Sequence, residues 1–327
     1  MKIFYFLFFA VTTFYIPLAY SDTPDLLFTD SITIDSFPIA LEKSYGLDIL
    51  RNHKTYVMGK QVLKLNDDLN LSGKNLRNIQ INRCFGELKN IIFDDCDLSG
   101  ANLRETVFVN CSFKNSNLAG CWIGTIKPDC DFTDAWIGGI EKGCQYLSIS
   151  KNQLLSTGSY KNNMLTNIFF TGSDFTGVDF SGCTLKGTSF YCQLNHCIFI
   201  NSDIEGVCFG ADIEVVQLLS TKNFREGLLK DVKFHRVIWS DDVIDMSRMS
   251  IIDCEFGSPR PKRDRVPPAK IDLTDSVISG CNFEYFRGLT IENVKSTWNY
   301  KYNRMEGIKL PKEIQDALDA EKTNEKP

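Results

Sequence analysis

The sequence is poor in the residues and motifs that most often carry catalysis. Its 327 residues include only three histidines, which leaves little material for general-base chemistry or for histidine-rich metal sites. It contains no Gly-rich phosphate loop, no His-Glu-x-x-His motif and no Cys-x-x-Cys pair. We therefore predict that the protein is not an enzyme, and we assign it no catalytic residue, no cofactor and no metal.

A strong charge of either sign is also lacking. There are 36 Lys and Arg against 41 Asp and Glu, which gives a formal net charge of −5. A protein that binds nucleic acid along its length would be basic, and a protein that imitates DNA would carry a dense acidic surface. We therefore expect no nucleic-acid partner.

The apolar run at the N-terminus predicts export. Met1 and Lys2 precede an almost wholly apolar stretch that ends at Tyr20. Such a segment is typical of a cleavable signal peptide, here residues 1–21, so we expect a periplasmic or extracellular protein without stable membrane insertion after cleavage. The alternative is a chain anchored in a membrane by the uncleaved segment, because about 18 apolar residues come close to spanning a bilayer.

A repeat of five residues runs through much of the remaining sequence. From Leu88 to Ile123 every fifth residue is Leu, Phe or Ile, and the residues two places earlier are small, apart from Ile91. Helices repeat a buried face about every 3.6 residues and strands about every 2, so neither explains this period. It predicts a solenoid in which each unit forms one side of a coil with its large residue inside. The predicted interior residues are Leu88, Phe93, Leu98, Leu103, Phe108, Phe113, Leu118, Ile123 and, in a later run, Phe170, Phe175, Phe180, Leu185 and Phe190.

Two segments resemble the pentapeptide repeat family, whose motif is Ala-(Asp/Asn)-Leu-x-x. They are Cys-Asp-Leu-Ser-Gly-Ala-Asn-Leu-Arg-Glu (96–105) and Ser-Asp-Phe-Thr-Gly-Val-Asp-Phe-Ser-Gly-Cys-Thr-Leu (173–185). The resemblance implies an all-β solenoid, a right-handed quadrilateral parallel β-helix in which four units make one coil. The repeats would then form about eight coils, with short helical insertions and helical caps.

The repeat is interrupted and bounded by segments of different composition. Caps are expected at both ends, because a solenoid otherwise leaves its terminal coils open. The aromatic C-terminal segment has two interpretations, a closed cap or the contact of a homodimer. The predicted regions are an N-terminal cap over 22–64, β-helix over 65–140, a helical insertion over 141–164, β-helix over 165–288 and a C-terminal cap over 289–327.

A Ser-Thr-x-x-aromatic motif recurs three times, beginning at Ser156, Ser220 and Ser296. We predict short helices beside these motifs, such as one over 214–222, that leave the coil and re-enter it. An enzymatic interpretation would make Ser156 or Ser220 a nucleophile, but no histidine recurs beside them to activate a hydroxyl. We favour hydroxyls that bond local backbone groups at a turn.

Residues 257–270 form a long insertion with four prolines, which cannot donate the hydrogen bonds of a strand ladder. A solvated connection is the simplest interpretation. The functional alternative is an electrostatic contact with an acidic partner or an anionic envelope surface, and a processing site is a third. The basic residues of this candidate interaction loop are Arg260, Lys262, Arg263, Arg265 and Lys270.

Twelve cysteines in an exported chain would normally indicate disulfides. Nine of them lie two residues before an inward Leu, Phe or Ile, in the small interior position where Cys acts as a compact apolar residue. Cys111 and Cys130, about one coil apart, are the pair that could form a disulfide instead. Cys84, Cys144 and Cys208 lie outside this position.

The sequence supports three hypotheses about function. The favoured one is an exported, non-enzymatic scaffold that binds an unidentified protein partner on a flat side or at an end of the solenoid. The second is a gyrase-interacting protein that imitates DNA, as the resemblance to quinolone-resistance members of the family implies, although the export signal, the mild charge and the basic loop depart from it. The third is an enzyme that uses the Ser-Thr turns.

Overall fold

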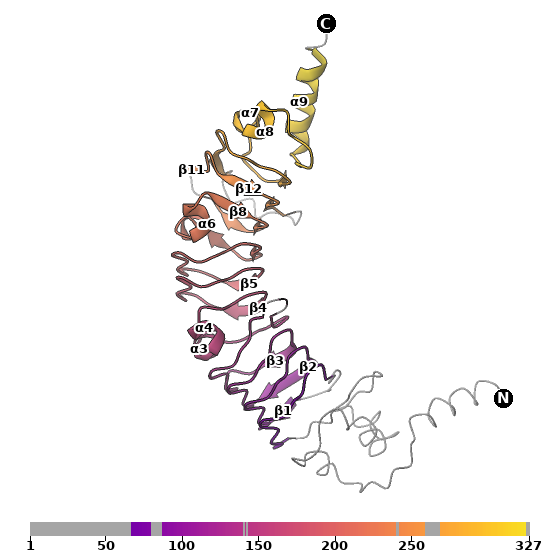
Figure 1. Cartoon of the computed structure of the whole chain (residues 1–327), viewed down its shortest axis with the longest axis vertical. Helices are drawn as coiled ribbons and strands as arrows, with labels where there is room; N and C mark the ends of the chain where they lie inside the picture. The colour runs from indigo at the N-terminus through magenta and orange to yellow at the C-terminus, as the bar shows by residue number, and fades with distance from the viewer. Residues whose placement is uncertain are drawn as a thin grey trace, which may run out of the picture. The chain divides into compact units, whose positions relative to one another are not determined.

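The chain divides into two compact units, Met1–Asn162 and Asn163–Pro327. The computed structural model describes residues 67–79, 87–139, 141, 143–239, 242–258 and 269–324. The predicted signal peptide, the whole predicted N-terminal cap, Cys84 and most of the predicted basic loop lie outside these residues. Each unit is described separately below (Figure 1).

The first unit is a stack of coils that are joined by parallel pairing (Figure 1). Ile92, Asp97, Asn102 and Val107 each pair with the following coil, so one contact falls in each five-residue unit. This coil therefore has four sides, as the family resemblance implies. The described strands form one parallel sheet in the order β1 (Glu87–Lys89), β2 (Asn102–Val109) and β3 (Trp122–Ile126).

The corners of these coils are turns with positive φ. The residue two places after the inward Leu or Phe has φ of 59° at Asp95, 69° at Gly100 and 53° at Asn115. Gly adopts this conformation without strain, and Asn and Asp tolerate it better than other residues do. The last two positions of the repeat therefore turn the chain through each corner.

The interior of the first unit is filled by large apolar side chains in register. The rings of Phe93, Phe113 and Phe132 stack with centroid distances of 4.9 Å at both steps. Coils about 4.8 Å apart place equivalent side chains at this stacking distance. Every interior residue named from the sequence, in both units, is at most 2% exposed.

The helical insertion of the first unit begins later than predicted. Gln145, which falls inside the predicted insertion 141–164, forms a parallel bridge with Trp122. The coil therefore continues at least to Gln145, whose N–H still donates to Cys121 O of the preceding coil at 2.8 Å. The helices are α3 (Lys151–Ser156) and α4 (Gly158–Lys161).

These helices do not leave the coil, as the sequence analysis predicted, but form one of its sides. Asp134 N donates a hydrogen bond to Ser156 O at 2.9 Å, and Gly158 N donates to Ala135 O at 2.9 Å. The ends of the two helices thus take the place that a five-residue unit holds in the other coils. Backbone pairing between coils therefore continues where the helices interrupt the repeat. The helix ends supply hydrogen-bond partners to backbone groups of the preceding coil.

The second unit has the same plan, and some of its coils are longer. Its described strands pair in parallel in one six-stranded sheet, in the order β15-β13-β9-β6-β5-β4, and in three two-stranded sheets, β10-β7, β11-β14 and β12-β8. The strands are β4 (Phe169–Asp174), β5 (Ser189–Gln193), β6 (Cys208–Phe209), β7 (Ile213–Glu214), β8 (Leu228–Lys230), β9 (Lys233–Phe234), β10 (Val237–Ile238), β11 (Val243–Asp245), β12 (Ser250–Ile252), β13 (Glu255–Gly257), β14 (Lys270–Asp272) and β15 (Asn282–Tyr285).

A ladder of phenylalanines lies behind the six-stranded sheet. Its rings stack in sequence with centroid distances of 5.6, 6.0, 6.5, 5.0 and 4.7 Å. Since one residue of each strand points inward and its two neighbours point outward, every strand adds one ring to the ladder. The six members are Phe170, Phe190, Phe209, Phe234, Phe256 and Phe283.

The helices of the second unit also differ from the prediction. The predicted single helix over 214–222 is two short helices, α5 (Val215–Leu218) and α6 (Lys222–Arg225), separated at Thr221. Thr221 has an extended backbone and caps α6, so it cannot continue α5. These helices lengthen the coil: Cys208 of β6 pairs with Lys233 of β9, a step longer than the four units of a regular coil.

The predicted C-terminal cap, residues 289–327, contains part of a further coil. It begins with α7 (Ile291–Ser296) and α8 (Trp298–Lys301), and Lys309 then forms a parallel bridge with Asn282. The last helix is α9 (Lys312–Asn324), which has 13 residues. Among the described residues, no helix is long and apolar enough to cross a membrane.

The described cysteines are buried and free. Cys111 and Cys130 do lie on adjacent coils, where the Cys111 N–H donates to the Cys130 sulfur at 3.4 Å, but no disulfide joins them. Cys144 and Cys208, which lie outside the predicted interior position, are 0% and 7% exposed. Most of these thiols therefore fill the interior, as small apolar residues would.

Candidate functional site

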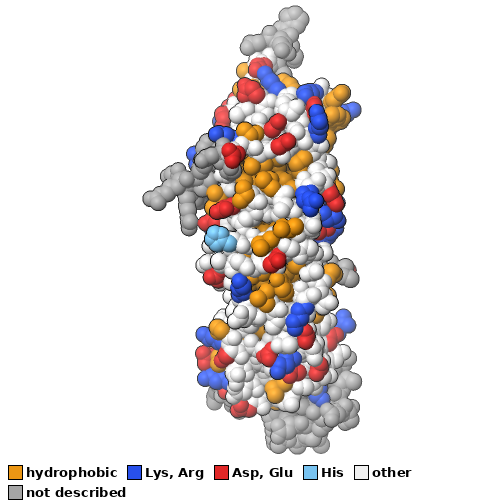
Figure 2. Space-filling view, turned by 90° about the vertical axis from the view of Figure 1, so that its left-hand side faces the viewer, with side chains coloured by type: hydrophobic (Ala, Val, Ile, Leu, Met, Phe, Trp, Pro, Cys, Tyr) orange, Lys and Arg blue, Asp and Glu red, His pale blue; other side chains and the backbone are white. Residues whose placement is uncertain are grey.

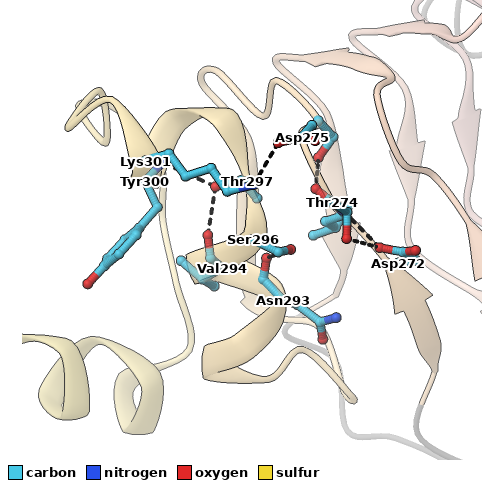
Figure 3. Close-up of polar contacts among 11 residues, drawn as sticks. Asp272, Thr274, Asp275, Asn293, Val294, Ser296, Thr297, Tyr300 and Lys301 are labelled. Carbon is cyan, nitrogen blue, oxygen red and sulfur yellow. Dashed lines mark hydrogen bonds and ion pairs between the residues drawn. The ribbon is translucent and has the colours of Figure 1, made fainter.

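The threonines of the Ser-Thr motif are caps between paired short helices. In the third copy, shown in Figure 3, Thr297 Oγ1 accepts from Tyr300 N at 3.2 Å and donates to Val294 O at 2.7 Å. Thr157 and Thr221 make the same two contacts in their copies. All three are 0% exposed, so these hydroxyls hold the turn between two helices.

The serines of the motif are also bonded locally. Ser296 Oγ donates to Asn293 O at 2.8 Å (Figure 3), and Ser156 and Ser220 donate to the equivalent carbonyls at 2.8 and 3.4 Å. A nucleophilic hydroxyl instead needs a base within hydrogen-bond reach. The contacts are those that the sequence analysis favoured, and they do not favour an enzyme at these turns.

An amide side chain three residues before each serine ties the helix pair to the neighbouring coil. Gln153 Nε2 donates to Lys127 O and to Cys130 O, both at 2.9 Å, while its Oε1 accepts from Ser150 N at 2.8 Å. Gln217 repeats this arrangement. The sequence analysis assigned no role to these amides, although the Gln-Leu-Leu-Ser-Thr segment occurs twice in the sequence.

The structure places one residue of the predicted basic loop in a strand. Lys270 begins β14, which pairs with β11 through Val243, so the insertion ends before Lys270 and not at it. The remaining basic residues of the loop, Arg260, Lys262, Arg263 and Arg265, lie outside the described residues. A role of this loop in binding therefore stays a prediction.

Four apolar side chains form an exposed patch on the second unit. Ile198 and Ile200 lie on either side of the buried Phe199 and are 43% and 49% exposed, while Val216 and Leu219, in and after α5, are 53% and 37% exposed. We call these four side chains the apolar patch. Exposed apolar side chains that lie together indicate an interaction site more strongly than scattered ones do.

Hydrogen bonds bring the two halves of the apolar patch together. Asn201 N donates to Ser220 O at 2.9 Å, and Gln217 Nε2 donates to Cys197 O at 2.8 Å. These contacts place the Ile198–Ile200 segment and α5 on neighbouring coils. The side of the molecule that carries α6 shows hydrophobic side chains gathered between charged ones (Figure 2).

A second cluster lies on the outer face of the six-stranded sheet. Cys208 Sγ is 3.6 Å from Tyr191 OH and 3.6 Å from His235 Nδ1. On the other side of the imidazole, His235 Nε2 lies 3.3 Å from Glu255 Oε2. We call these four residues the Cys208 cluster. Tyr191, Cys208 and Glu255 belong to β5, β6 and β13, and His235 directly follows β9. They point outward because the adjacent phenylalanines point inward.

The Cys208 cluster makes its imidazole more basic than a free one. The contact with the Cys208 sulfur, and then the Glu255 carboxylate, raise the pKa of His235 above its usual value despite burial. His235 Nε2 is buried and makes no hydrogen bond, so its contact with Glu255 is an ion pair without hydrogen-bond geometry. The ring is thus held between a thiol and a carboxylate.

The Cys208 cluster is not arranged as a metal site. The sulfur and the carboxylate face opposite nitrogens of one imidazole, whereas metal ligands converge on one point. In the part of the chain that the structure describes, no three His, Cys, Asp or Glu residues are grouped so that they could hold a metal ion. A linear order of thiol, imidazole and carboxylate instead suits proton transfer.

The sequence analysis missed this cluster, although it placed Cys208 outside the interior position. Cys208 and Glu255 each precede a ladder phenylalanine and His235 follows one, which is the signal for outward side chains on one sheet. The signal could not be used from the sequence, because insertions of unequal length separate the three residues. Only the strand pairing shows that β6, β9 and β13 are neighbours.

Other thiols have a different environment, inside the coils. Cys96 Sγ donates to Leu71 O at 2.9 Å, and Cys197 Sγ donates to Phe175 O at 3.0 Å. Burial raises the pKa of Cys96 and of Cys183 to about 11. Such thiols stay protonated and unreactive.

The coils are built from five-residue units, each with an inward Leu or Phe and a turning Asn, Asp or Gly. Comparison with known protein families identifies this kind of repeat. The profile of the pentapeptide repeats matches eight copies in residues 91–123 and 162–190. Both segments of this chain therefore carry pentapeptide repeats.

Solved structures of the family are similar to this chain at low identity. HetL, a pentapeptide repeat protein involved in heterocyst differentiation regulation from the cyanobacterium Nostoc sp. strain PCC 7120, is 12% identical, with 67% of this chain and 88% of that chain covered and a TM-score of 0.21. Full-length QnrB1, a plasmid-mediated fluoroquinolone resistance protein, is 15% identical, with 79% and 98% covered and a TM-score of 0.18. No curated protein matches this chain.

Proposed function

We propose that this protein is an exported, non-enzymatic scaffold that binds a partner protein through the apolar patch of its second unit. The observation that supports this most directly is the exposure of Ile198, Ile200, Val216 and Leu219 on neighbouring coils. The scaffold itself would be a right-handed, four-sided β-helix, as in other members of the family. The partner is a protein with a complementary apolar surface.

The physical basis of this proposal is apolar burial on a rigid support. Covering a fully exposed Leu, Ile or Val side chain is worth about 1.5–3 kcal/mol, so four partly exposed ones can supply the centre of a small interface. The backbone beneath them is held by bonds between coils, such as Asn201 N to Ser220 O. A surface that is already ordered loses little entropy on binding.

The polar side chains of the motifs support a non-enzymatic role. The hydroxyls of Ser156 and Thr157 and the amide of Gln153 are engaged by backbone groups. Their equivalents in the other helix pairs are engaged in the same way. Side chains that complete the wall of a solenoid in this manner have no free group to offer to a substrate.

Site-specific photocrosslinking tests the apolar patch. A photoreactive residue at Ile200 should give a defined adduct with a partner protein in cells that express the chain, and Val216→Glu should abolish it by adding a charge to the interface. The control is the same photoreactive residue at Tyr302, which is 63% exposed and follows α8. Absence of an adduct at Ile200, or the same adduct at Tyr302, would remove the patch from the proposal.

Export and the gyrase alternative need separate measurements. The intact mass of the protein recovered from fractionated cells and medium should correspond to a chain that begins at Asp22 outside the cytoplasm. A chain that keeps Met1 in the cytoplasm would contradict export. In that case a DNA supercoiling assay with gyrase tests the second candidate, which rests on the family resemblance alone.

A further inference from the structure

We infer that Cys208 is a reactive thiol that forms a mixed disulfide with small-molecule disulfides, with His235 as the proton acceptor and Glu255 as a positioning residue. This would be a stoichiometric modification of one side chain and not catalytic turnover. It does not depend on the proposed binding function, because the Cys208 cluster and the apolar patch are built from different residues.

The argument begins with the order of groups across the imidazole. Cys208 Sγ faces Nδ1 at 3.6 Å and Glu255 Oε2 faces Nε2 at 3.3 Å. A carboxylate at one ring nitrogen favours the tautomer that carries its proton there, which leaves the other nitrogen to accept the thiol proton. It also stabilises the cation that forms after transfer, as the raised pKa of His235 indicates.

The exchange reaction balances with a low-molecular-weight disulfide as the co-reactant. The Cys208 thiol passes its proton to His235 Nδ1, and the resulting thiolate attacks one sulfur of the disulfide. The sulfur–sulfur bond of the reagent breaks as the new bond to Cys208 forms. The leaving thiolate takes up the proton that His235 holds, so one reagent disulfide and one protein thiol become one mixed disulfide and one free thiol.

Tyr191 controls access to the sulfur. Cys208 is only 7% exposed, and the Tyr191 hydroxyl lies 3.6 Å from its sulfur. The Tyr191 ring stacks on Phe169 at 5.1 Å and covers Gly210, where an added Cβ would collide with Tyr191 Cε1. The cover is thus one side chain, Tyr191, on the outer face of the sheet. A small reagent reaches Cys208 when the Tyr191 side chain moves.

The primary test is the rate of reaction with 4,4′-dithiodipyridine under native conditions, with the modified cysteine located by peptide mass analysis. Cys208 is expected to react first among the described cysteines, and Cys208→Ser should abolish this phase. His235→Asn should lower the rate at pH 7 by roughly tenfold or more and should make the rate rise with pH. Cys183→Ser, which replaces a buried interior thiol, is the matched control and should change nothing.

Two further variants separate chemistry from access and from folding. Tyr191→Ala should raise the rate by removing the cover, whereas Tyr191→Phe keeps the ring and should change it little. Glu255→Gln should lower the rate less than His235→Asn does, and it serves in place of that variant if His235→Asn does not fold. Circular dichroism and thermal unfolding check that each variant retains the native structure.

Three results would overturn the inference. One is a fast phase that persists in Cys208→Ser, since another thiol would then be the reactive one. Another is a Cys208 rate that neither His235→Asn nor Glu255→Gln changes in folded protein. The third is no reaction at Cys208 in Tyr191→Ala, because removing the cover should expose an activated sulfur.

Discussion

At the scale of single residues, the corners of the coils depend on side chains that tolerate a left-handed backbone. Asn90 and Asn110 have φ of 57° and 51° on successive coils. Their amides also form a ladder: Asn110 Nδ2 donates to Asn90 Oδ1, and Asn90 Nδ2 donates to Asp68 Oδ1, both at 2.7 Å. One residue type therefore supplies both the turn and a bond between coils.

Substitution of Asn110 separates these two contributions. Asn110→Gly and Asn110→Ala both remove the amide ladder, but only alanine places a Cβ in the left-handed conformation, which costs about 1–2 kcal/mol. The unfolded glycine variant has more conformational freedom to lose on folding, which offsets part of this cost. We therefore expect the alanine variant to be less stable than the glycine variant by about 1 kcal/mol. Urea unfolding of the two variants measures the difference, and equal stabilities would contradict the strain.

At the scale of elements, the paired helices are substitutes for one side of a coil. A helix has backbone groups at its ends that lack partners, and here the neighbouring coil supplies them through Asp134 N and Ala135 O. The amide of Gln153 then bonds carbonyls of the coil before it. The helix pair is thus joined to the stack by the same kind of contact as a strand.

Gln153→Ala should destabilise this element by about 1–3 kcal/mol. It removes the amide donor of the Lys127 and Cys130 carbonyls, of which the Lys127 carbonyl keeps a bond from Cys130 N. An unsatisfied buried group costs about this much. The control is Asn152→Ala, an exposed residue of the same helix, which should stay within about 0.5 kcal/mol. Urea unfolding compares the two. Equal effects would show that the amide contacts contribute nothing.

The phenylalanine ladder makes the six-stranded sheet sensitive to the loss of one ring. Phe190 is 0% exposed and stacks on Phe170 and Phe209, so Phe190→Ala leaves a cavity between two rings. The expected loss is about 3–5 kcal/mol in the free energy of unfolding. Ile200→Ala, at an exposed position, is the control. A loss below about 1 kcal/mol for Phe190→Ala would mean that the neighbouring coils close the gap.

At the scale of the whole molecule, ion pairs cross from one coil to the next along the outer surface. Glu205 lies between two lysines of flanking coils, 2.8 Å from Lys186 Nζ and 3.1 Å from Lys230 Nζ. Lys186, and then Lys230, lower the pKa of Glu205. Lys301 likewise lowers the pKa of Asp275. Although the net charge of the chain is mild, opposite charges on its surface are therefore paired in order from coil to coil.

These pairs predict a loss of stability in acid. A carboxylate whose pKa is lower in the folded protein than in the unfolded chain contributes stability above the unfolded pKa, about 4.5 for Glu, and this is lost as the pH falls through the folded pKa. The thermal midpoint should therefore drop below about pH 4.5. Glu205→Gln should show a smaller drop than the native protein, and identical profiles would contradict the contribution of this pair.

Much of the fold could be predicted because the repeat acts locally. Each five-residue unit specifies its own inward residue and its own corner, so Phe93 or Leu98 can be placed from neighbours in sequence. The helix pairs were placed less well, since Gln145 still pairs in a segment that was predicted to be an insertion and Thr221 divides a helix that was predicted to be single. Backbone pairing between coils decided both.

The sequence by itself determined the repeating unit, the buried side chains and the turning residues, because these depend on spacing within a few residues. Only the tertiary structure decided which outward side chains meet. His235 lies between Cys208 and Glu255 because coils of unequal length bring β6, β9 and β13 into register. Ile198 likewise lies near α5 because α5 takes the place of a coil side. Such meetings depend on the length of each insertion, which the period of five does not contain.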